Sequence, residues 1–242
     1  MNLIIDVGNT FVKFAIYDNG KLKEKVAGNL SDFHTMVLDV FKNYPDINAA
    51  ITSSVGKLKD SHLKVLRAKV QVLELSHKLK LPFINLYATP KTLGVDRIAL
   101  VSASVEQFPN NHVLIIDAGT CITYDFINKE NEYLGGAISP GIRLRYRTLH
   151  NLTANLPLLE TKMPQDILGD STENSIHSGV VHGVLKEIDG VIDDYANKYP
   201  DLTVILTGGD TKFLSNQLKN SIFANSNFLL EGLNFILEYN SQ

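Results

Sequence analysis

One local pattern occurs twice in the chain, and it restricts the possible folds more than any other feature. An apolar run ends in an acidic glycine turn, Asp6-Val7-Gly8-Asn9-Thr10 in the first copy and Asp117-Ala118-Gly119-Thr120 in the second. An offset of 111 positions superposes the two turns and carries Ile16 onto Ile127. A single Asp-x-Gly string is usually only a turn, because Asp and Gly favour turns for conformational reasons. The strand, turn and hairpin pattern around both copies therefore predicts an internal duplication, with a cleft between two similar halves, residues 1–110 and 111–242.

Apolar periodicity along the rest of the chain alternates between strand and helix. A hairpin is expected at Asn19-Gly20, the strongest short-range hairpin signal. Further strands are expected at residues 48–53, 70–75, 112–116 and 203–206. Helices are expected at residues 29–42, 57–68, 95–107, 144–151 and 172–197. This alternation predicts an α/β protein.

Charge and cysteine content exclude several functional classes. With 23 Lys and Arg against 26 Asp and Glu, the formal net charge is −3, and no basic block indicates a nucleic-acid-binding face. Cys121 is the single cysteine, so neither an internal disulfide nor a cysteine-rich zinc site is expected. The start of the sequence lacks the basic residues of a signal peptide, and no run approaches ~20 apolar residues. We therefore expect a cytoplasmic protein whose partners are neither nucleic acids nor membranes.

Three glycine turns at strand ends have a chemistry that suits phosphate. The third turn is Thr207-Gly208-Gly209-Asp210. Glycine lets the backbone approach a ligand and present N–H groups, while Asn and Thr add neutral hydrogen bonds. Because the carboxylates of Asp6 and Asp117 would repel phosphate, they predict an intervening Mg²⁺, with or without a second ion. Lys13 lies on the adjoining strand and can reach the same phosphates as a point charge.

The three turns resemble the first phosphate, second phosphate and adenosine turns of the acetate kinase, sugar kinase, Hsp70 and actin superfamily. Within it, the chain resembles type III pantothenate kinase along nearly its whole length. The strings that carry this resemblance are Leu93-Gly94-Val95-Asp96-Arg97, Gly135-Gly136-Ala137-Ile138-Ser139-Pro140-Gly141, Thr153-Ala154-Asn155-Leu156-Pro157 and Gly169-Asp170-Ser171-Thr172. The resemblance implies duplicated actin-like (ribonuclease H-like) halves around a central cleft. It also implies ATP-dependent phosphorylation of pantothenate to 4′-phosphopantothenate, the first step toward coenzyme A.

The resemblance also implies a role for individual residues. Asp96 is the expected general base, Asp6 binds Mg²⁺ through water, and Asp117 lies near a monovalent cation, K⁺ or NH₄⁺. The residues expected to bind ATP are Asp6, Gly8, Asn9, Thr10, Lys13, Gly119, Thr120 and Gly208. The residues expected around pantothenate are Tyr87, Gly94 and Arg97, with Thr172 reaching it from the neighbouring subunit of a homodimer whose substrate site is near the interface. Gly136 and Gly141 are expected beside the transferred group.

The residues taken alone leave alternatives open. Asp96 reads equally well as a helix-start carboxylate, Arg97 as a side chain that ties down a helix, and Thr172 as a helix-capping hydroxyl. Gly179 and Gly183, four apart on one helix face, predict a close approach by another element or subunit. The alternative functions are a kinase or phosphatase of another small alcohol, or a non-catalytic regulatory relative. Three carboxylates near phosphate argue against a simple binding protein.

Overall fold

The computed structural model describes residues 1–8, 11–54 and 58–241. Contacts between residues group the chain into two compact units. The first unit consists of Met1–Pro109, Asn131–Tyr133 and Asn227–Gln242, and the second of Asn110–Glu130 and Leu134–Ser226. Among the described residues, no helix combines the length and apolar character needed to cross a bilayer.

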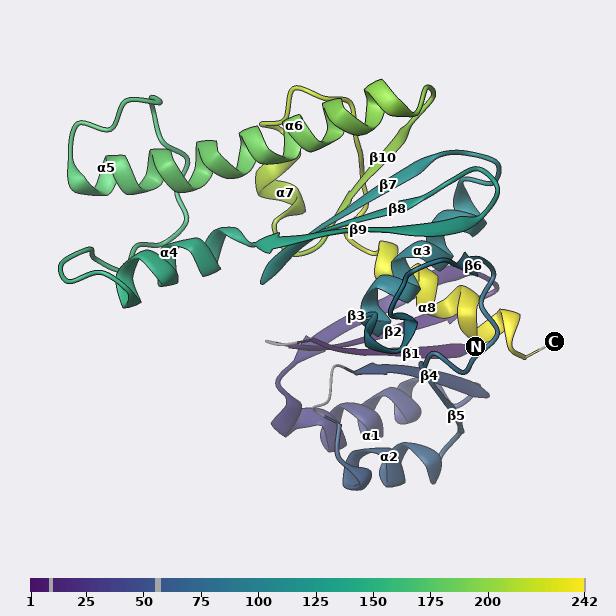
Figure 1. The fold of residues 1–242 in the computed structure, drawn as a ribbon. Helices are drawn as coiled ribbons and strands as arrows, with labels where there is room; N and C mark the ends of the chain where they lie inside the picture. Colours follow the sequence, from purple (N-terminus) through teal and green to yellow (C-terminus); the bar gives the residue numbers. More distant parts are fainter. Residues whose placement is uncertain (9–10, 55–57, 242) are drawn as a thin grey trace. The chain divides into compact units, whose positions relative to one another are not determined.

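The first unit is built on a five-stranded sheet with the order β3-β2-β1-β4-β5 (Figure 1). Its strands are β1 (Asn2–Val7), β2 (Val12–Asp18), β3 (Lys21–Gly28), β4 (Ala49–Ser54) and β5 (Gln71–Glu74). The first three form an antiparallel meander, and β4 and β5 continue it in parallel with β1. Asn19 and Gly20 both have positive φ, 49° and 73°, as a two-residue hairpin turn requires, so the hairpin predicted there is confirmed.

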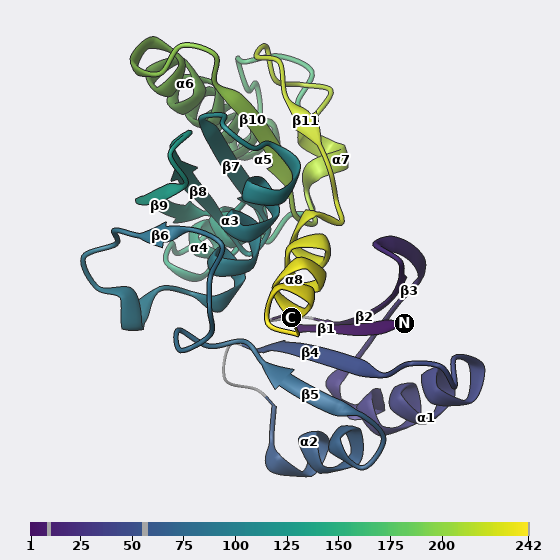
Figure 2. The same ribbon diagram turned by 90° about the vertical axis from the view of Figure 1, so that its right-hand side faces the viewer.

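Helices cover both faces of this sheet (Figures 1 and 2). One face carries α1 (Phe33–Asn43) and α2 (Asp60–Arg67), and the other α3 (Val95–Gln107) and α8 (Phe228–Tyr239). Leu3, Ile5 and Val7 of β1 join the apolar core under α1. Because side chains alternate along a strand, Asp6 lies on the opposite face, where α8 packs on β1. A Cβ at Gly232 of α8 would lie 1.9 Å from the carbonyl oxygen of Ala99, so α3 and α8 approach closely only with glycine here.

The second unit repeats this strand order as β9-β8-β7-β10-β11. Its strands are β7 (Val113–Ala118), β8 (Cys121–Ile127), β9 (Glu132–Pro140), β10 (Thr203–Thr207) and β11 (Phe223–Ala224). Again an antiparallel pair, β7 with β8, is extended by a strand parallel to the first, β10 beside β7. The short strand β6 (Ile84–Asn85) pairs with Glu132 and Tyr133 at the start of β9. These two residues of β9 belong to the first unit.

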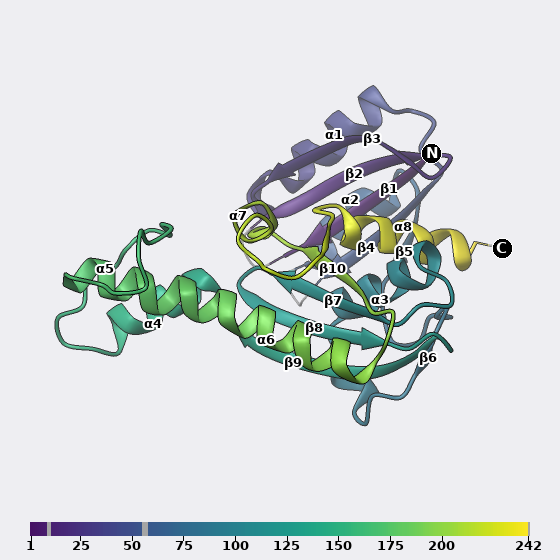
Figure 3. The ribbon, with the colours of Figure 1, turned by 90° about the horizontal axis from the view of Figure 1, so that it is seen from above.

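A long helical segment covers the second sheet. It consists of α5 (Thr172–His177), a π-helical turn (Ser178–His182) and α6 (Gly183–Lys198), close to the range of the predicted helix. The core residues Tyr124 and Phe126 of β8 pack in one cluster with Val184 and Ile188 of α6. The remaining helices are α4 (Ile142–Asn151) and the single turn α7 (Thr211–Leu214). Within this unit, α4 and α5 extend beyond the edge of the sheet (Figures 1 and 3).

The two halves of the sequence follow the same course of elements. In both, three strands are followed by a helical segment, a strand, a helix, a strand and a last helix, α3 in the first half and α8 in the second. The first half adds the short strand β6 before α3, and the helical segment of the second half comprises α4, α5 and α6. The strand register shows where the copies differ. Leu3 and Leu114 are equivalent at the offset of 111, but Leu3 pairs with Ile16 whereas Leu114 pairs with Phe126. The predicted superposition of Ile16 on Ile127 is therefore wrong by one residue, because the second turn is one residue shorter than the first.

Candidate active site

Asp6 is a buried carboxylate at the carboxyl end of β1. It is 8% exposed, and Lys13, its register partner on β2, holds its Nζ 3.8 Å from Asp6 Oδ2. Burial raises the pKa of Asp6 from 3.8 to about 6; the charge of Lys13 lowers this pKa and that of Asp96 raises it further. A carboxylate that is costly to ionise and faces a second carboxylate is stabilised by a bound cation.

The glycine turn after Asp6 is only partly within the described residues. Gly8 donates its N–H to the carbonyl oxygen of Phe11 over 3.1 Å, which closes the turn at its base. Asn9 and Thr10, both expected to bind phosphate, lie outside the described residues. Lys13 is half-exposed, so its ammonium reaches solvent as well as Asp6.

Asp96 lies in the first turn of α3, as the helix-start interpretation requires. One carboxylate oxygen, Oδ1, accepts the N–H of Arg97 over 2.9 Å. A Cβ at Gly94 would lie 2.3 Å from this same oxygen, so Asp96 occupies the space that a side chain at position 94 would fill. Asp6 and Asp96 are electrostatically coupled through the pKa of Asp6. The first unit therefore brings the expected general base and the expected magnesium-binding carboxylate into electrostatic reach.

Arg97 and Tyr87 lie together beside Asp96. The Arg97 side chain is buried, and its guanidinium carbon lies 5.6 Å from the centroid of the Tyr87 ring. The Tyr87 ring in turn lies 6.0 Å from that of Tyr133, and the neighbouring backbone is held by a hydrogen bond from Leu86 N–H to the Tyr133 carbonyl. The structure thus gathers Tyr87, Gly94 and Arg97, three of the four residues expected around the substrate.

The second unit places the second phosphate turn against the adenosine turn. Gly119 donates its N–H to the Cys121 carbonyl over 2.9 Å, as Gly8 does in the first unit. Gly208 has φ +95°, and a Cβ there would lie 2.3 Å from Asp117 Oδ1. Asp210 completes the contact by donating its N–H to the Ala118 carbonyl over 3.0 Å. Only glycine at position 208 lets the two turns meet.

The glycine-rich string after Tyr133 forms most of β9, the strand that returns from the second of the two hairpins that the duplicated pattern predicts. At its end, Gly141 donates its N–H to the Thr120 carbonyl over 3.0 Å, and a Cβ there would lie 2.1 Å from the Gly119 carbonyl oxygen. Gly141 therefore does lie against the second phosphate turn. At Gly136, by contrast, a Cβ would lie 1.6 Å from the Tyr124 carbonyl oxygen, so this glycine is required for packing on the backbone of β8.

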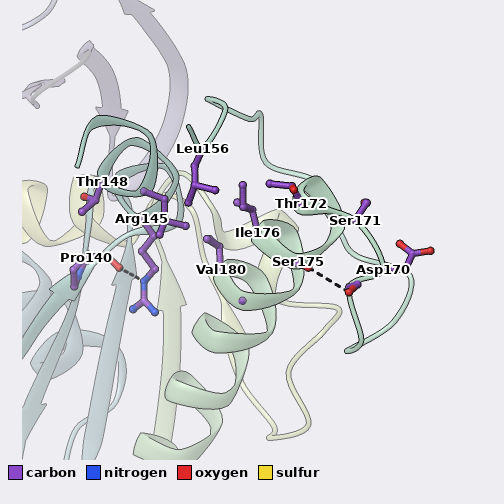
Figure 4. A pocket seen from close by; sticks show the side chains of 13 residues that line it. Pro140, Arg145, Thr148, Leu156, Asp170, Ser171, Thr172, Ser175, Ile176 and Val180 are labelled. Atoms are coloured by element: carbon purple, nitrogen blue, oxygen red, sulfur yellow. Dashed lines mark hydrogen bonds between the residues drawn. The ribbon is translucent and has the colours of Figure 1, made fainter. Parts of the chain in front are cut away.

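Thr172 is the first residue of α5, and the neighbouring Ser171 is the helix cap. Ser171 Oγ accepts the N–H of Asn174 over 3.2 Å, so the capping role considered for Thr172 belongs to Ser171. Thr172 lines a cavity of about 1090 Å³ between α4 and the α5 segment (Figure 4). Gly179 also lines it, and a Cβ there would meet no atom of the described chain within 4 Å. The predicted close approach at Gly179 is therefore not made by the described residues of this chain.

Two ion pairs near the second phosphate turn were not recognised in the sequence. Arg143, in the first turn of α4, places a guanidinium nitrogen 2.8 Å from Asp210 Oδ1. Arg145 pairs with Glu187 of α6 over 2.5 Å and also bonds to the Pro140 carbonyl over 2.9 Å. No sequence signal distinguishes these two arginines from Arg147, the third arginine of α4, because each pair joins residues far apart in the chain.

Side chains of the described residues do not form a complete metal cage. Within residues 1–8, 11–54 and 58–241, no group of three or more His, Cys, Asp or Glu side chains could hold an ion. Protein sites usually hold a hard cation such as Mg²⁺ through one or two carboxylates together with phosphate oxygens and water. The buried carboxylate of Asp6 is a suitable ligand for such a cation.

Replacing Asp6 with Asn should stabilise the ligand-free protein at neutral pH. Because the pKa rises from 3.8 to about 6 on folding, the folded state binds the proton more tightly, and the wild-type free energy of unfolding falls as pH rises across this window. The shift corresponds to up to about 3 kcal/mol at pH 7. Urea unfolding should therefore show that Asp6→Asn is more stable than wild type at about pH 7.5, with a much smaller difference near pH 4.

Asp39→Asn, at an exposed aspartate of α1, is the matched control and should change the free energy of unfolding little at either pH. An Asp6→Asn stabilisation that is equal at both pH values would show that burial of the ionised carboxylate is not its cause.

The sequence is similar to one family of known proteins over most of its length. A family model described as type III pantothenate kinase matches residues 2–194. A type III pantothenate kinase of Christiangramia forsetii is 53% identical over 240 residues, which cover 99% of both chains. One of Flavobacterium johnsoniae is 46% identical over 239 residues, covering 99% of this chain and 98% of the relative.

Solved structures show the fold independently. A Campylobacter jejuni structure described as a Baf family transcriptional activator matches with a TM-score of 0.65 at 25% identity, covering 99% of this chain and 98% of the other. A ROK family glucokinase from Streptomyces griseus, solved with glucose and AMPPNP, matches with a TM-score of 0.54 at 11% identity, covering 100% and 99%. These likenesses confirm the predicted α/β fold with duplicated actin-like halves. The full-length matches to curated relatives show that the chain belongs to the type III pantothenate kinase family and is a phosphotransferase.

Proposed function

We propose that the chain transfers the γ-phosphoryl group of ATP to the primary hydroxyl of pantothenate, forming 4′-phosphopantothenate on the way to coenzyme A. Family membership supports the reaction class and the substrate. The observation that carries the chemistry is the cluster of Asp6, Asp96, Arg97 and Tyr87, which supplies two carboxylates, a cation and an aromatic face within one unit.

Asp96 is the proposed general base. As the hydroxyl oxygen forms its bond to the γ-phosphorus, the bond from this phosphorus to the ADP oxygen breaks, and the hydroxyl proton passes to the Asp96 carboxylate. The N–H of Arg97 fixes the orientation of this carboxylate through Oδ1. Gly94 leaves the space that the carboxylate occupies. The main tasks of the protein are to position the hydroxyl and to stabilise the transferred charge.

Arg97 is the proposed partner of the pantothenate carboxylate. A guanidinium can bind a carboxylate through two parallel hydrogen bonds, and these are stronger where water is excluded, as at the buried Arg97. Tyr87 stacks near the guanidinium and restricts its orientation. Gly94, next to the Asp96 and Arg97 side chains, would let the backbone come close to the substrate.

The glycine turns are the proposed phosphate sites. Gly8, Asn9, Thr10 and Lys13 would hold the phosphates from the first unit and Gly119 and Thr120 from the second, with the adenosine at Gly208. Asp6 would hold Mg²⁺ through water, and this ion would neutralise charge on the triphosphate. The raised pKa of Asp6 fits a position that binds a cation along with the nucleotide.

Asp117 is the proposed ligand of a monovalent cation, K⁺ or NH₄⁺. Its carboxylate oxygen lies in the space next to Gly208 that a side chain would fill, beside the Ala118 carbonyl. Carboxylate and carbonyl oxygens are ligands that suit such an ion. Replacing K⁺ by Na⁺ at constant ionic strength should lower the pantothenate-dependent rate, and an unchanged rate would remove the ion from this position.

The reaction itself is tested by coupled ADP release with and without pantothenate. Wild-type protein should release ADP only when pantothenate is present. Asp96→Asn should keep its melting temperature and ATP affinity but lose most of its kcat, on the order of 100-fold or more, because an amide accepts no proton. Near-normal kcat with intact ATP binding would exclude Asp96 as the base.

The same assay separates the alternatives. Release driven by other small alcohols instead of pantothenate would indicate another kinase on this fold. Release that needs no alcohol would indicate a phosphatase or ATPase, and the absence of any release would indicate a regulatory binding protein. Asp39→Asn, at an exposed aspartate of α1, serves as the control and should leave kcat unchanged.

We further propose that the active form is a homodimer, with Thr172 reaching the pantothenate site of the partner. The segment around the α4–α5 cavity exposes Leu152, Leu158, Ile167 and Leu168, the last at 80%. Exposed apolar patches next to a hollow are typical of protein interfaces. Sedimentation velocity during turnover should therefore show a dimer, and a fully monomeric active enzyme would contradict this assembly.

A further inference from the structure

The two acidic turns differ in the residue that faces the aspartate across the strand pair. In the first unit, the register partner of Asp6 on β2 is Lys13. In the second unit, the register partner of Asp117 on β8 is Thr123, which carries no charge. The strand pair of the second unit therefore lacks the cation that the first unit places beside its aspartate.

Arg143 supplies a cation to this part of the second unit from a different element. It lies in the first turn of α4, just after Gly141, whose N–H is bonded to the Thr120 carbonyl. A guanidinium nitrogen of Arg143 is 3.9 Å from the position of a Cβ at Gly209. The side chain thus lies against the adenosine turn, on a helix that starts beside the second phosphate turn.

Asp210 holds the guanidinium there and leaves part of it available. The Arg143 side chain is 51% exposed, whereas that of Asp210 is 6% exposed, and one guanidinium nitrogen lies 2.8 Å from Asp210 Oδ1. A guanidinium has five N–H donors, so a single contact leaves most of them open to another anion. The other carboxylate oxygen, Asp210 Oδ2, is buried and has no hydrogen-bond partner among the described residues.

We propose that Arg143 binds the polyphosphate of the nucleotide and that Asp210 positions it. This inference rests on the proposed function, because it needs a nucleotide at the Gly208 turn. Planar guanidinium groups match phosphate oxygens through two hydrogen bonds. Asp117 and Asp210 bring two negative charges to these turns, and Arg143 offsets part of that charge where the nucleotide brings more.

The test is nucleotide binding by calorimetry, with no pantothenate present. Arg143→Gln should weaken ADP binding by about 10-fold or more, since charge-assisted hydrogen bonds to phosphate are lost. Its affinity for adenosine, which has no phosphate, should change less than about twofold. Arg143→Lys should fall between wild type and Arg143→Gln, because lysine keeps the charge but loses the planar fork.

Arg147→Gln is the matched control, an exposed arginine of the same helix, and should bind ADP as wild type does. In steady-state kinetics, Arg143→Gln should raise the KM for ATP by a similar factor, with the KM for pantothenate little changed. The positioning role of Asp210 predicts that adding Asp210→Asn to Arg143→Gln causes no further loss of ADP affinity, whereas Asp210→Asn alone weakens it.

Unchanged ADP affinity in a folded Arg143→Gln variant would overturn the proposal. So would an equal loss of ADP and adenosine affinity, because that result would assign Arg143 to the shape of the turn. Failure of the wild-type protein to bind ADP, or to release it in the presence of pantothenate, would instead refute the proposed function before any variant is compared.

Discussion

The buried carboxylate of Asp6, near the end of the first strand, is the constraint on which the rest of the first unit's site depends. It brings a negative charge to the edge of a sheet, and burial makes that charge costly. The sheet order, the glycine turn and the neighbouring cation all act on this one group. A site that destabilises its own ionised carboxylate gains free energy when a cation and an anionic ligand arrive together.

Close backbone approach is the second requirement, and glycines meet it at different places. Gly208 and Gly141 each touch the second phosphate turn, one from β10 and one from β9, so three segments far apart in sequence share one small volume. Gly232 does the same for α3 and α8, and this contact supports the helix that carries Asp96. Packing of the first unit and placement of Asp96 are therefore linked through the backbone.

Sequence reasoning predicted the parts of this structure that local pattern determines. The acidic turns, the Asn19-Gly20 hairpin and the α3 range follow from periodicity and turn chemistry, which act over a few residues. The close packing of Gly136 on the backbone of β8 was missed, because it depends on which strand lies alongside. The pairing of Arg143 with Asp210 was also missed, because it depends on tertiary contact alone. The same limit applies to the one-residue offset between the halves, which only the strand register shows.

The duplication makes these differences informative. The two sheets share one strand order, so residues at equivalent register positions can be compared directly. Lys13 beside Asp6 and Thr123 beside Asp117 are such a difference, and it leaves the second turn dependent on cations from elsewhere. Arg143, from a different element, pairs with Asp210 in the turn that contacts the Asp117 turn. The repeated order of strands thus carries a different side chain opposite the aspartate in each unit.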